Sequence, residues 1–493
     1  MHKSQIFLGL MLGFLLGIFW TSFWSFNLLF FWLVSVMAIG LIVVAYKKKI
    51  LLFIGLVAIM FALGQLRTFV AISKLDKLSS EIKPIATTTV ISAEPEKKEF
   101  YQNLIVEIPA HEFLLNNPSQ DTFKILIRTD LYRDFSCGEK IKLKCQAEIV
   151  KNVSDQFDYR MYLAKDKIYY TCPKAQIEKT GSSEKGFLTS ILKVRTALEA
   201  KINKIIPEPQ ASLANGVLFG GGNRLSKELQ NTFSQTGMTH IVAVSGYNVT
   251  IIAEYLMLIG IFFGLWRTQS FYFAVLGIFI FIAMIGFPSS ALRAGLMGGL
   301  ILWAIKNGRL ANLDNAVLLA ATIMLAINPL LLRWDIGFQL SFLATVGLIK
   351  LAPFWDKYFL KKYKTLGILD IILMTISAQL FVLPIILYNF HNLALISILA
   401  NLLILPVVPL TMLFVFLTAI GGFISPPLSM IFGWLAYTLL KYEIEVISFL
   451  AGLKWASLEI AVFNWWGVVI WYFLLLGLVY QINKINNKDN DFK

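Results

Sequence analysis

Long apolar stretches recur along most of the chain, and only short polar segments separate them. Most are long enough for one helix to cross roughly 30 Å of hydrocarbon. They lie near residues 5–22, 25–45, 50–70, 238–265, 270–286, 289–306, 314–328, 336–352, 367–388, 393–421, 428–450 and 462–482. The pattern predicts a polytopic α-helical membrane protein, in which Pro406 and Pro409 break one span into two half-helices.

One polar segment, 73–186, interrupts this pattern. Five runs in it have the composition of strands, and several alternate polar and apolar positions. These runs are Thr87–Ala93, Leu104–Ile108, Phe123–Arg128, Lys140–Ile149 and Lys167–Cys172. Residues 157–163, between the last two runs, predict one or two helical turns. Five strands within about 100 residues favour a small barrel of the OB type, and a β-sandwich spacer is the alternative.

Helical spacing returns after residue 186. Apolar residues such as Ile191, Leu198 and Ile202 recur on one side, while basic residues occupy the rest of the helical wheel. Because basic amphipathic helices favour a membrane surface, interfacial helices are expected over 187–237. No Gly-Lys-Ser/Thr follows the triple glycine 220–222, which argues against a phosphate loop and indicates a flexible joint.

The stretch from Met238 to Ile252 differs from the other spans because a polar break interrupts it. It opens with His240, and Ser245-Gly246-Tyr247-Asn248 then separates a short apolar run from the next helix. Backbone groups freed by such a break are tolerated at membrane depth only inside protein or beside a wet cavity. The break therefore indicates a passage for something hydrophilic. A helix N-cap at the membrane surface is the alternative interpretation.

Polar residues within other apolar spans are informative because burying them in lipid is costly. Arg293, near the start of its span, either snorkels to the interface or faces a cavity as a buried cation suited to an anionic backbone. Asp335 and Gln339 share one helix face. As alternatives to a place along the passage, Asp335 would be a helix N-cap and Gln339 would form a helix–helix contact. Asn401 enters the proline-broken span, where freed carbonyls and amides would line a conduit.

Composition and charge support this description. The chain is 57% hydrophobic and only 15% charged, whereas soluble proteins carry about a quarter charged residues. The net charge of +14 lies almost wholly outside residues 73–185, which carry 18 basic against 17 acidic side chains. Basic loops orient membrane proteins, so Lys47-Lys48-Lys49 places its loop in the cytoplasm and segment 73–186 outside. No cleavage site follows the first span, which is expected to be a retained helix.

All three cysteines, Cys137, Cys145 and Cys172, fall within segment 73–186. No CxxC pair or histidine cluster accompanies them, so a zinc site is not expected. An extracellular location permits a disulfide. Cys145 and Cys172 are each in phase with the apolar residues of a predicted strand, which favours that pair, and Cys137 with Cys172 stays open.

Catalytic signals are weak. His240 and Ser245 could act as base and nucleophile, but no acid that would orient the histidine is evident near them. The sequence holds no HExxH and no Walker motif, so neither a metal nor a cofactor is expected. We therefore expect a protein that is not an enzyme, in which any work against a gradient is driven by a partner.

Several separate motifs resemble the ComEC competence-protein family. They are LANGVLFGGGNRLSKELQNTFSQTGMTHIVAVSGYNVTII, PSSALRAGLM, WDIGFQLSFLATVGLI and the region from Asn401 to Pro406, in that order. The segment FDYRMYLAKDKIYY resembles the family's N-terminal OB-like domain. The resemblance divides the chain into three N-terminal helices (1–72), an extracellular OB-like domain (73–186), interfacial helices (187–237), a channel domain (238–483) and a polar tail (484–493).

The resemblance implies an inner-membrane channel for natural transformation, which passes one DNA strand into the cytoplasm. The residues expected to line or shape the passage are His240, Ser245, Gly246, Tyr247, Asn248, Ser289, Arg293, Asp335, Gln339, Ser341 and Asn401. Expected partners are single-stranded DNA, the lipid bilayer, an extracellular DNA receptor and a cytoplasmic ATPase or helicase. A homo-oligomer is compatible with this arrangement.

In one respect the sequence departs from the family pattern. Many family members continue into a metallo-β-lactamase-like domain, whereas this sequence stops at Lys493 and contains no HxHxDH motif. The second strand would therefore be degraded by a separate nuclease. Two alternative functions stay open, a transporter of another anionic polymer or lipid-linked sugar and a membrane-embedded hydrolase that uses Ser245.

Overall fold

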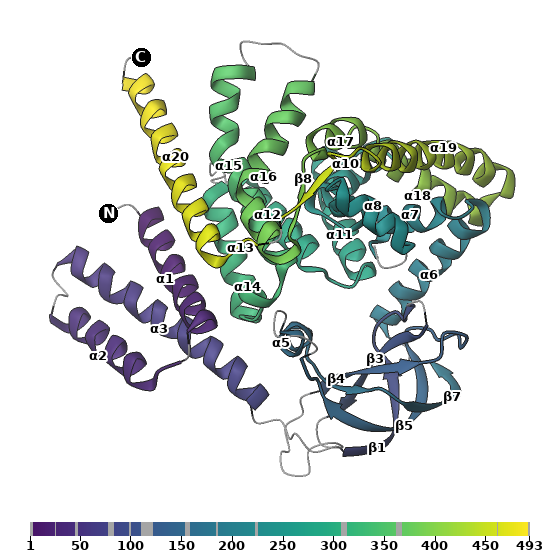
Figure 1. Ribbon diagram of the computed structural model, residues 1–493, viewed down its shortest axis with the longest axis horizontal. Helices are drawn as coiled ribbons and strands as arrows, with labels where there is room; N and C mark the ends of the chain where they lie inside the picture. Colours follow the sequence, from purple (N-terminus) through teal and green to yellow (C-terminus); the bar gives the residue numbers. More distant parts are fainter. Residues whose placement is uncertain are drawn as a thin grey trace. The chain divides into compact units, whose positions relative to one another are not determined.

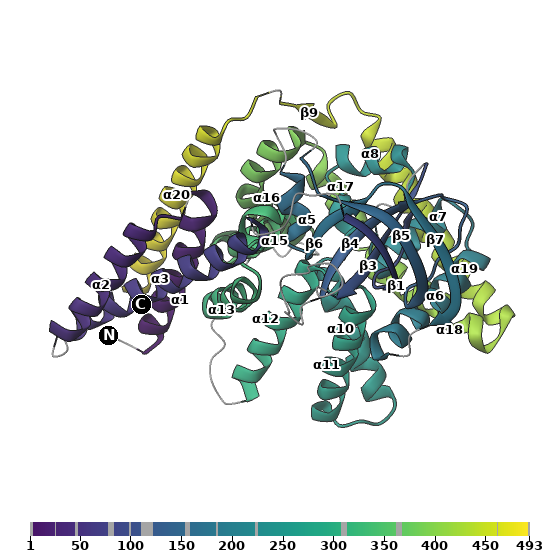
Figure 2. The same cartoon turned by 90° about the horizontal axis from the view of Figure 1, so that it is seen from below.

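The computed structural model forms two compact units, 1–192 with 310–339 and 193–309 with 340–493 (Figures 1 and 2). The residues that it describes are 3–24, 26–44, 48–76, 83–97, 100–109, 122–152, 158–183, 186–221, 225–306, 313–360, 367–460 and 462–491. The first unit joins the N-terminal helices and the β domain to 310–339, a segment that we expected to belong to the channel domain. The compact units therefore do not coincide with the segments expected from the sequence.

The helices of the first unit are α1 (Lys3–Phe23), α2 (Leu28–Val44), α3 (Lys49–Asp76), α13 (Leu313–Ile327), α14 (Leu331–Trp334) and the start of α15 (Ile336–Trp355). Helix α3 packs against both α1 and α2 (Figure 1). Glycines bring α1 and α3 close together, since a Cβ atom on Gly17 would lie 2.0 Å from the Phe61 carbonyl oxygen. Small residues permit this kind of approach between apolar helices.

Hydrogen bonds from two arginines connect residues 313–339 to the N-terminal helices. Arg67 of α3 donates from Nε to the Ala326 carbonyl at 2.8 Å and from Nη2 to the Ile327 carbonyl at 2.5 Å. Arg333 donates to the Ser22 carbonyl at the end of α1. The last carbonyls of a helix lack intrahelical partners, so these arginines satisfy them. Their contacts explain why a distant segment belongs to the first unit.

The β domain is a closed five-stranded barrel with two additional strands. The strands are β1 (Lys83–Ile91), β2 (Glu96–Lys97), β3 (Gln102–Pro109), β4 (Thr122–Thr129), β5 (Glu139–Ile149), β6 (Ile168–Cys172) and β7 (Ala175–Ser183). The ring runs β1-β3-β4-β6-β5 and closes through β1–β5 pairing, while β2 pairs with β3 and β7 with β5 (Figure 2). The five predicted strands are confirmed, and the predicted helical turn is α5 (Tyr159–Ala164). Phe157 lies outside the described residues.

The barrel core contains one face of each alternating strand. In β5, Ile141, Leu143, Cys145 and Ala147 are buried while the intervening residues are exposed. Cys145 forms a disulfide with Cys172, and Cys137 is a free thiol. Burial raises the pKa of the Cys137 thiol to about 11, which keeps it protonated and slow to react near neutral pH.

The second unit is helical apart from one short two-stranded ribbon. Its elements are α6 (Phe187–Ile205, which begins in the first unit), α7 (Gln210–Phe219), α8 (Lys227–Gln235), α9 (Thr239–Val242), α10 (Gly246–Phe262), α11 (Arg267–Met284), α12 (Ser289–Lys306), most of α15, the π-helix η2 (Asp356–Leu360), α16 (Ile368–Phe390), β8 (Asn392–Ala394), α17 (Ser397–Ile404), α18 (Val408–Ile424), α19 (Pro426–Ala451), β9 (Ser457–Glu459) and α20 (Trp465–Asp491). Strands β8 and β9 pair antiparallel. Helix α20 continues through most of the expected polar tail.

Helix α7 corrects the expectation of interfacial helices over 187–237. Every residue of α7 except Ser212 is buried, because the helix packs against α18 and α19 (Figures 1 and 2). Gly216 permits a close approach of α9, since a Cβ atom on it would lie 2.6 Å from a methyl group of Val242. Helix α8 is amphipathic, with Leu229 and Phe233 buried. Gly222, of the triple glycine, lies outside the described residues.

Six described helices are long and apolar enough to cross a membrane: α1, α3, α11, α15 extended to Phe359, α16 and α20 up to Ile482. Helices α17 and α18 would form a seventh span, bent by 49° at the predicted proline break. The expectation of a polytopic helical membrane protein with a small barrel is confirmed. Fewer helices qualify than the sequence pattern predicts. Helices α2, α10 and α13 have only 15 to 17 residues, and α12 and α19 are not among the qualifying helices either.

Candidate functional site

The predicted break in the stretch from Met238 to Ile252 is present. Helix α9 ends at Val242 and α10 begins at Gly246, and Ala243 and Ser245 between them are extended. The Ser245 hydroxyl donates to Oδ1 of Asn248 at 3.1 Å, and it accepts no hydrogen bond from the first turn of α10. The N-cap alternative for the Ser245 side chain is therefore not what the structure shows.

Asn248 and Tyr247 join this break to other parts of the second unit. Asn248 is 1% exposed, and its amide donates to the Val217 carbonyl of α7 at 3.0 Å. The hydroxyl of Tyr247 donates to the Leu405 carbonyl at 3.2 Å. A buried amide needs such partners. Both side chains therefore fix the start of α10 in the fold.

Arg293 of α12 lies beside this break. It is only 8% exposed, so it does not snorkel to the surface. Its guanidinium donates to the hydroxyl of Thr345 on α15 and lies 5.7 Å from the Phe342 ring centroid. A Cβ atom on Gly246 would be 3.1 Å from Nη2 of Arg293. The glycine at the start of α10 thus permits the guanidinium to approach the backbone.

Two further contacts hold this group of residues in place. The hydroxyl of Ser290, in the first turn of α12, donates to the Val244 carbonyl at 2.5 Å. The hydroxyl of Thr345 donates to the Ser341 carbonyl at 2.9 Å. Ser289, at the start of α12, and Ser341 are half-buried. Arg293 therefore lies beside Gly246 and is linked to Ser341 through Thr345, a residue that was not predicted from the sequence.

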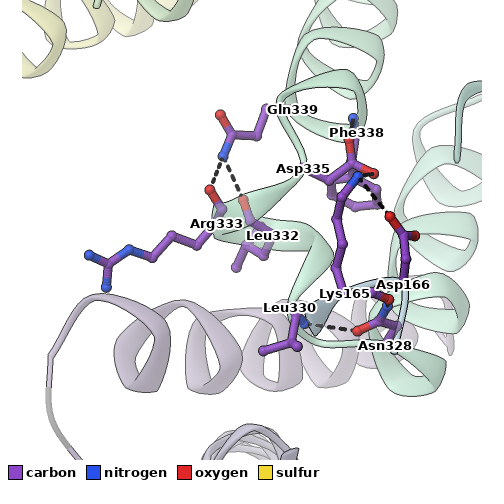
Figure 3. Close-up of polar contacts among 9 residues, drawn as sticks. All are labelled: Lys165, Asp166, Asn328, Leu330, Leu332, Arg333, Asp335, Phe338 and Gln339. Carbon is purple, nitrogen blue, oxygen red and sulfur yellow. Dashed lines mark hydrogen bonds and ion pairs between the residues drawn. The ribbon is translucent and has the colours of Figure 1, made fainter. Parts of the chain in front are cut away.

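Asp335 belongs to a different group, in the first unit (Figure 3). It precedes α15 and accepts a hydrogen bond from the Phe338 N–H at 3.1 Å, so the N-cap alternative is present. Its carboxylate also lies 3.5 Å from Nζ of Lys165, which follows α5 of the barrel. Burial opposes the charged form of Lys165, but the carboxylates of Asp166 and Asp335 raise the pKa of the ammonium above its usual value. The pair joins the barrel to the beginning of α15.

Neighbouring residues strengthen the same connection. The amide of Asn328 donates to the Lys165 carbonyl at 2.8 Å, and its Oδ1 accepts from the Leu330 N–H at 3.2 Å (Figure 3). Gln339 donates to the carbonyls of Leu332 and Arg333 at 2.8 and 3.0 Å. Asp335 and Gln339 thus stabilise the turn between α14 and α15, which is a structural role.

Replacing Asp335 by alanine is expected to destabilise the protein by about 2–4 kcal/mol. About 1 kcal/mol comes from the lost N-cap, and the rest from leaving a buried ammonium with one fewer carboxylate. Thermal unfolding of the detergent-solubilised protein measures the change. Asp166→Asn is the matched control, because the Asp166 side chain is 58% exposed and lies 3.8 Å from the same ammonium. Equal effects of both substitutions would contradict the role assigned to Asp335.

Two tyrosines form hydrogen bonds with carbonyls at the break between α17 and α18. Tyr247 donates to the Leu405 carbonyl at 3.2 Å and Tyr255 to the Pro409 carbonyl at 2.8 Å. Some of the carbonyls that the sequence analysis assigned to a conduit are therefore satisfied within protein. Asn401 is buried and donates to the Thr375 hydroxyl at 3.5 Å, while its Oδ1 has no hydrogen-bond partner. It contacts α16 and not the group around Arg293.

The two candidate catalytic residues are not paired. A ring nitrogen of His240 lies 3.0 Å from the Gly237 carbonyl oxygen, whereas the Ser245 hydroxyl bonds to Asn248. A nucleophile and its base should be within hydrogen-bond reach, and these contacts direct them elsewhere. Within the described ranges no three His, Cys, Asp or Glu residues are grouped as metal ligands would be.

Two polar contacts that the sequence analysis missed lie in the second unit. Thr345 positions Arg293, and its spacing of four residues from Ser341 is a helical signal that could have identified it. Glu443 of α19 is 1% exposed and accepts a hydrogen bond from the Thr411 hydroxyl of α18 at 2.6 Å. Glu443 lies between Lys441 and Glu445, so the sequence alone makes it look like part of a solvated charged face.

Comparison with known proteins places more than half of the chain in one family. The family model described as "Competence protein" matches residues 217–484, more than half of the chain. ComE operon protein 3 of Bacillus subtilis (strain 168) is 28% identical over 260 residues. That alignment covers 52% of this chain but only 32% of the relative's length. No solved structure matches the chain. Gly246, Arg293 and Thr345 all lie within the matched region.

Proposed function

Because the chain belongs to the competence-protein family, we propose that it serves DNA uptake in natural transformation, as the channel through which a single strand enters the cytoplasm. The group around Arg293 is the observation that carries this proposal. It places a buried guanidinium beside a broken helix, within apolar helices and inside the family-matched region. Buried cations in apolar helical segments are typical of pathways for polar or charged molecules.

The proposal includes the setting of the channel. The protein would lie in the bacterial inner membrane with the barrel outside, an orientation that the basic loop at Lys48 and Lys49 favours. The Cys145–Cys172 disulfide suits an oxidising compartment. The chain would not itself be an enzyme. It would depend on an extracellular DNA receptor, a cytoplasmic ATPase or helicase as motor, and a separate nuclease.

A deletion strain tests the proposal. Labelled duplex DNA should bind to cells that lack the protein, but the label should not reach the cytoplasm, and the intact gene should restore its entry. Arg293→Ala should reduce entry by about tenfold or more at normal protein level, because hydrogen bonds to charged groups contribute about 1.5–3 kcal/mol. The matched control is Arg267→Ala, since Arg267 is an exposed arginine at the start of α11.

The same strain separates the alternatives. Entry of label without the protein would refute the channel, and an anionic polymer other than DNA would then be the next cargo to assay. Ser245→Ala should retain most uptake if the protein is a conduit and lose it if Ser245 is a nucleophile. The existing contact between Ser245 and Asn248 favours the first result.

A further inference from the structure

The first turn of α10 has backbone N–H groups without partners. Val249 is the first residue of α10 whose N–H bonds within the helix, to the Ser245 carbonyl at 3.3 Å. The N–H groups of Gly246, Tyr247 and Asn248 precede it, and no acceptor for them lies among the described residues. Ser245 does not cap them. The positive end of the α10 dipole is therefore open to an anion.

Arg293 supplies a second donor at the same place. The residue is 8% exposed, and its Nε is buried without a hydrogen-bond partner. Its described polar contact is the bond from Nη1 to Thr345, and no carboxylate of the described chain forms an ion pair with it. A buried cation without a counter-charge is costly. An anion at this position would remove that cost.

The guanidinium of Arg293 lies close to the first turn of α10. Nη2 of Arg293 lies 3.1 Å from the position that a Cβ atom of Gly246 would take. Gly246 is the first residue of α10, so the guanidinium reaches the turn that carries the free N–H groups. Thr345 holds the guanidinium from α15, and Ser290 ties α12 to Val244, just before the turn. The guanidinium and the free N–H groups therefore lie next to each other.

We infer that the first turn of α10 and Arg293 form a binding site for a phosphodiester group of the translocating strand. An arginine fork and helix N-terminal amides both recognise phosphate oxygens. Gly246 lets the guanidinium come close to this turn, because any other side chain would stand against it. The inference rests on the proposed function and makes it more specific, because it assigns one backbone contact along the path without reading sequence.

Oligonucleotide binding by the purified full-length protein in zwitterionic lipid nanodiscs tests this site. We expect Arg293→Gln to weaken binding of a short oligothymidylate by roughly tenfold and to lower the slope of log affinity against log salt by about one. Binding of the same oligomer with an uncharged methylphosphonate backbone should not change. Arg267→Gln is the control, because it removes an exposed arginine from the start of α11.

Two further variants keep the test decisive if Arg293→Gln folds poorly. Arg293→Lys keeps the charge but loses the fork, so it should weaken phosphodiester binding less than Arg293→Gln does. Gly246→Ala should weaken it while leaving Arg293 intact. Equal affinity of these variants and the wild type, or equal losses for both oligomers, would overturn the site. Competition by phosphatidylglycerol in the nanodiscs that abolishes the dependence on Arg293 would also overturn it, by assigning the site to lipid.

The site and the channel can fail separately. If Arg293→Gln binds the oligomer normally but blocks uptake in cells, the phosphate site is refuted and the channel stands. If binding depends on Arg293 but the deletion strain still takes up DNA, the site stands and the channel is refuted.

Discussion

Replacing Gly17 by leucine is expected to prevent the native packing of α1 against α3. A Cβ atom at Gly17 would lie 2.0 Å from the Phe61 carbonyl oxygen, and one at Gly64 would lie 2.2 Å from the Phe14 carbonyl oxygen. Backbone cannot move aside as a flexible side chain can. Overpacking a core typically costs about 1–3 kcal/mol, and a clash with backbone places this case at or above the upper end. That is a large part of a typical folding free energy.

The change should appear as a lower yield of folded protein and a lower thermal unfolding temperature in detergent. Gly40→Leu is the matched control, because Gly40 lies in the neighbouring apolar helix α2 and a Cβ atom there meets nothing within 4 Å. The control should fold as the wild type does. A Gly17→Leu protein with wild-type stability would mean that α1 and α3 do not cross at these glycines.

Removing the disulfide should have the second large effect. Cys145 and Cys172 are 27 residues apart and join β5 to β6 inside the barrel. A disulfide that closes a loop of that length restricts the unfolded chain and so raises the free energy of unfolding by about 3–4 kcal/mol. Cys172→Ser should therefore make the barrel much more sensitive to protease, and dithiothreitol should produce the same sensitivity in the wild-type protein. Limited proteolysis of the full chain in nanodiscs, followed by mass spectrometry, measures both.

Cys137→Ser is the control for this experiment. Cys137 is a free thiol in the same domain, partly exposed, with its Sγ 3.4 Å from the Ile91 carbonyl oxygen. Its replacement should leave protease sensitivity nearly unchanged. If Cys137→Ser exposed the barrel as strongly as Cys172→Ser does, the pairing of Cys145 with Cys172 would be wrong.

Local patterns predicted individual elements well where one face of an element is buried. The alternation in β5, from Ile141 to Ile149, fixed that strand because a shift by one residue would expose its apolar side chains. The break at Ser245–Gly246 and the proline break before α18 were visible because Gly and Pro interrupt a helix whatever surrounds them. Residues 210–219 were misread because nothing local shows that α18 and α19 cover this helix.

For the polar candidate residues, too, the sequence identified the residue and only the structure identified its partner. The sequence marked Arg293, Asp335 and Asn248 as unusual, because polar groups in apolar helices always require partners. It could not say which partners, since these lie far along the chain. Asp335 pairs with Lys165 of the barrel, and Asn248 is satisfied by the Val217 carbonyl. Both therefore have structural roles that a motif alone does not reveal.

By itself, the sequence determined that the chain is a helical membrane protein with a small inserted barrel. Hydrophobic period and span length are local properties, and lipid permits few alternatives to a helix. Only the tertiary structure decided which helix ends are satisfied and which are left open. The carbonyl at Leu405 is bonded by Tyr247, whereas the first turn of α10 keeps free N–H groups beside Arg293. Whether a backbone group at a helix end finds a hydrogen-bond partner depends on contacts between distant segments, which no local pattern encodes.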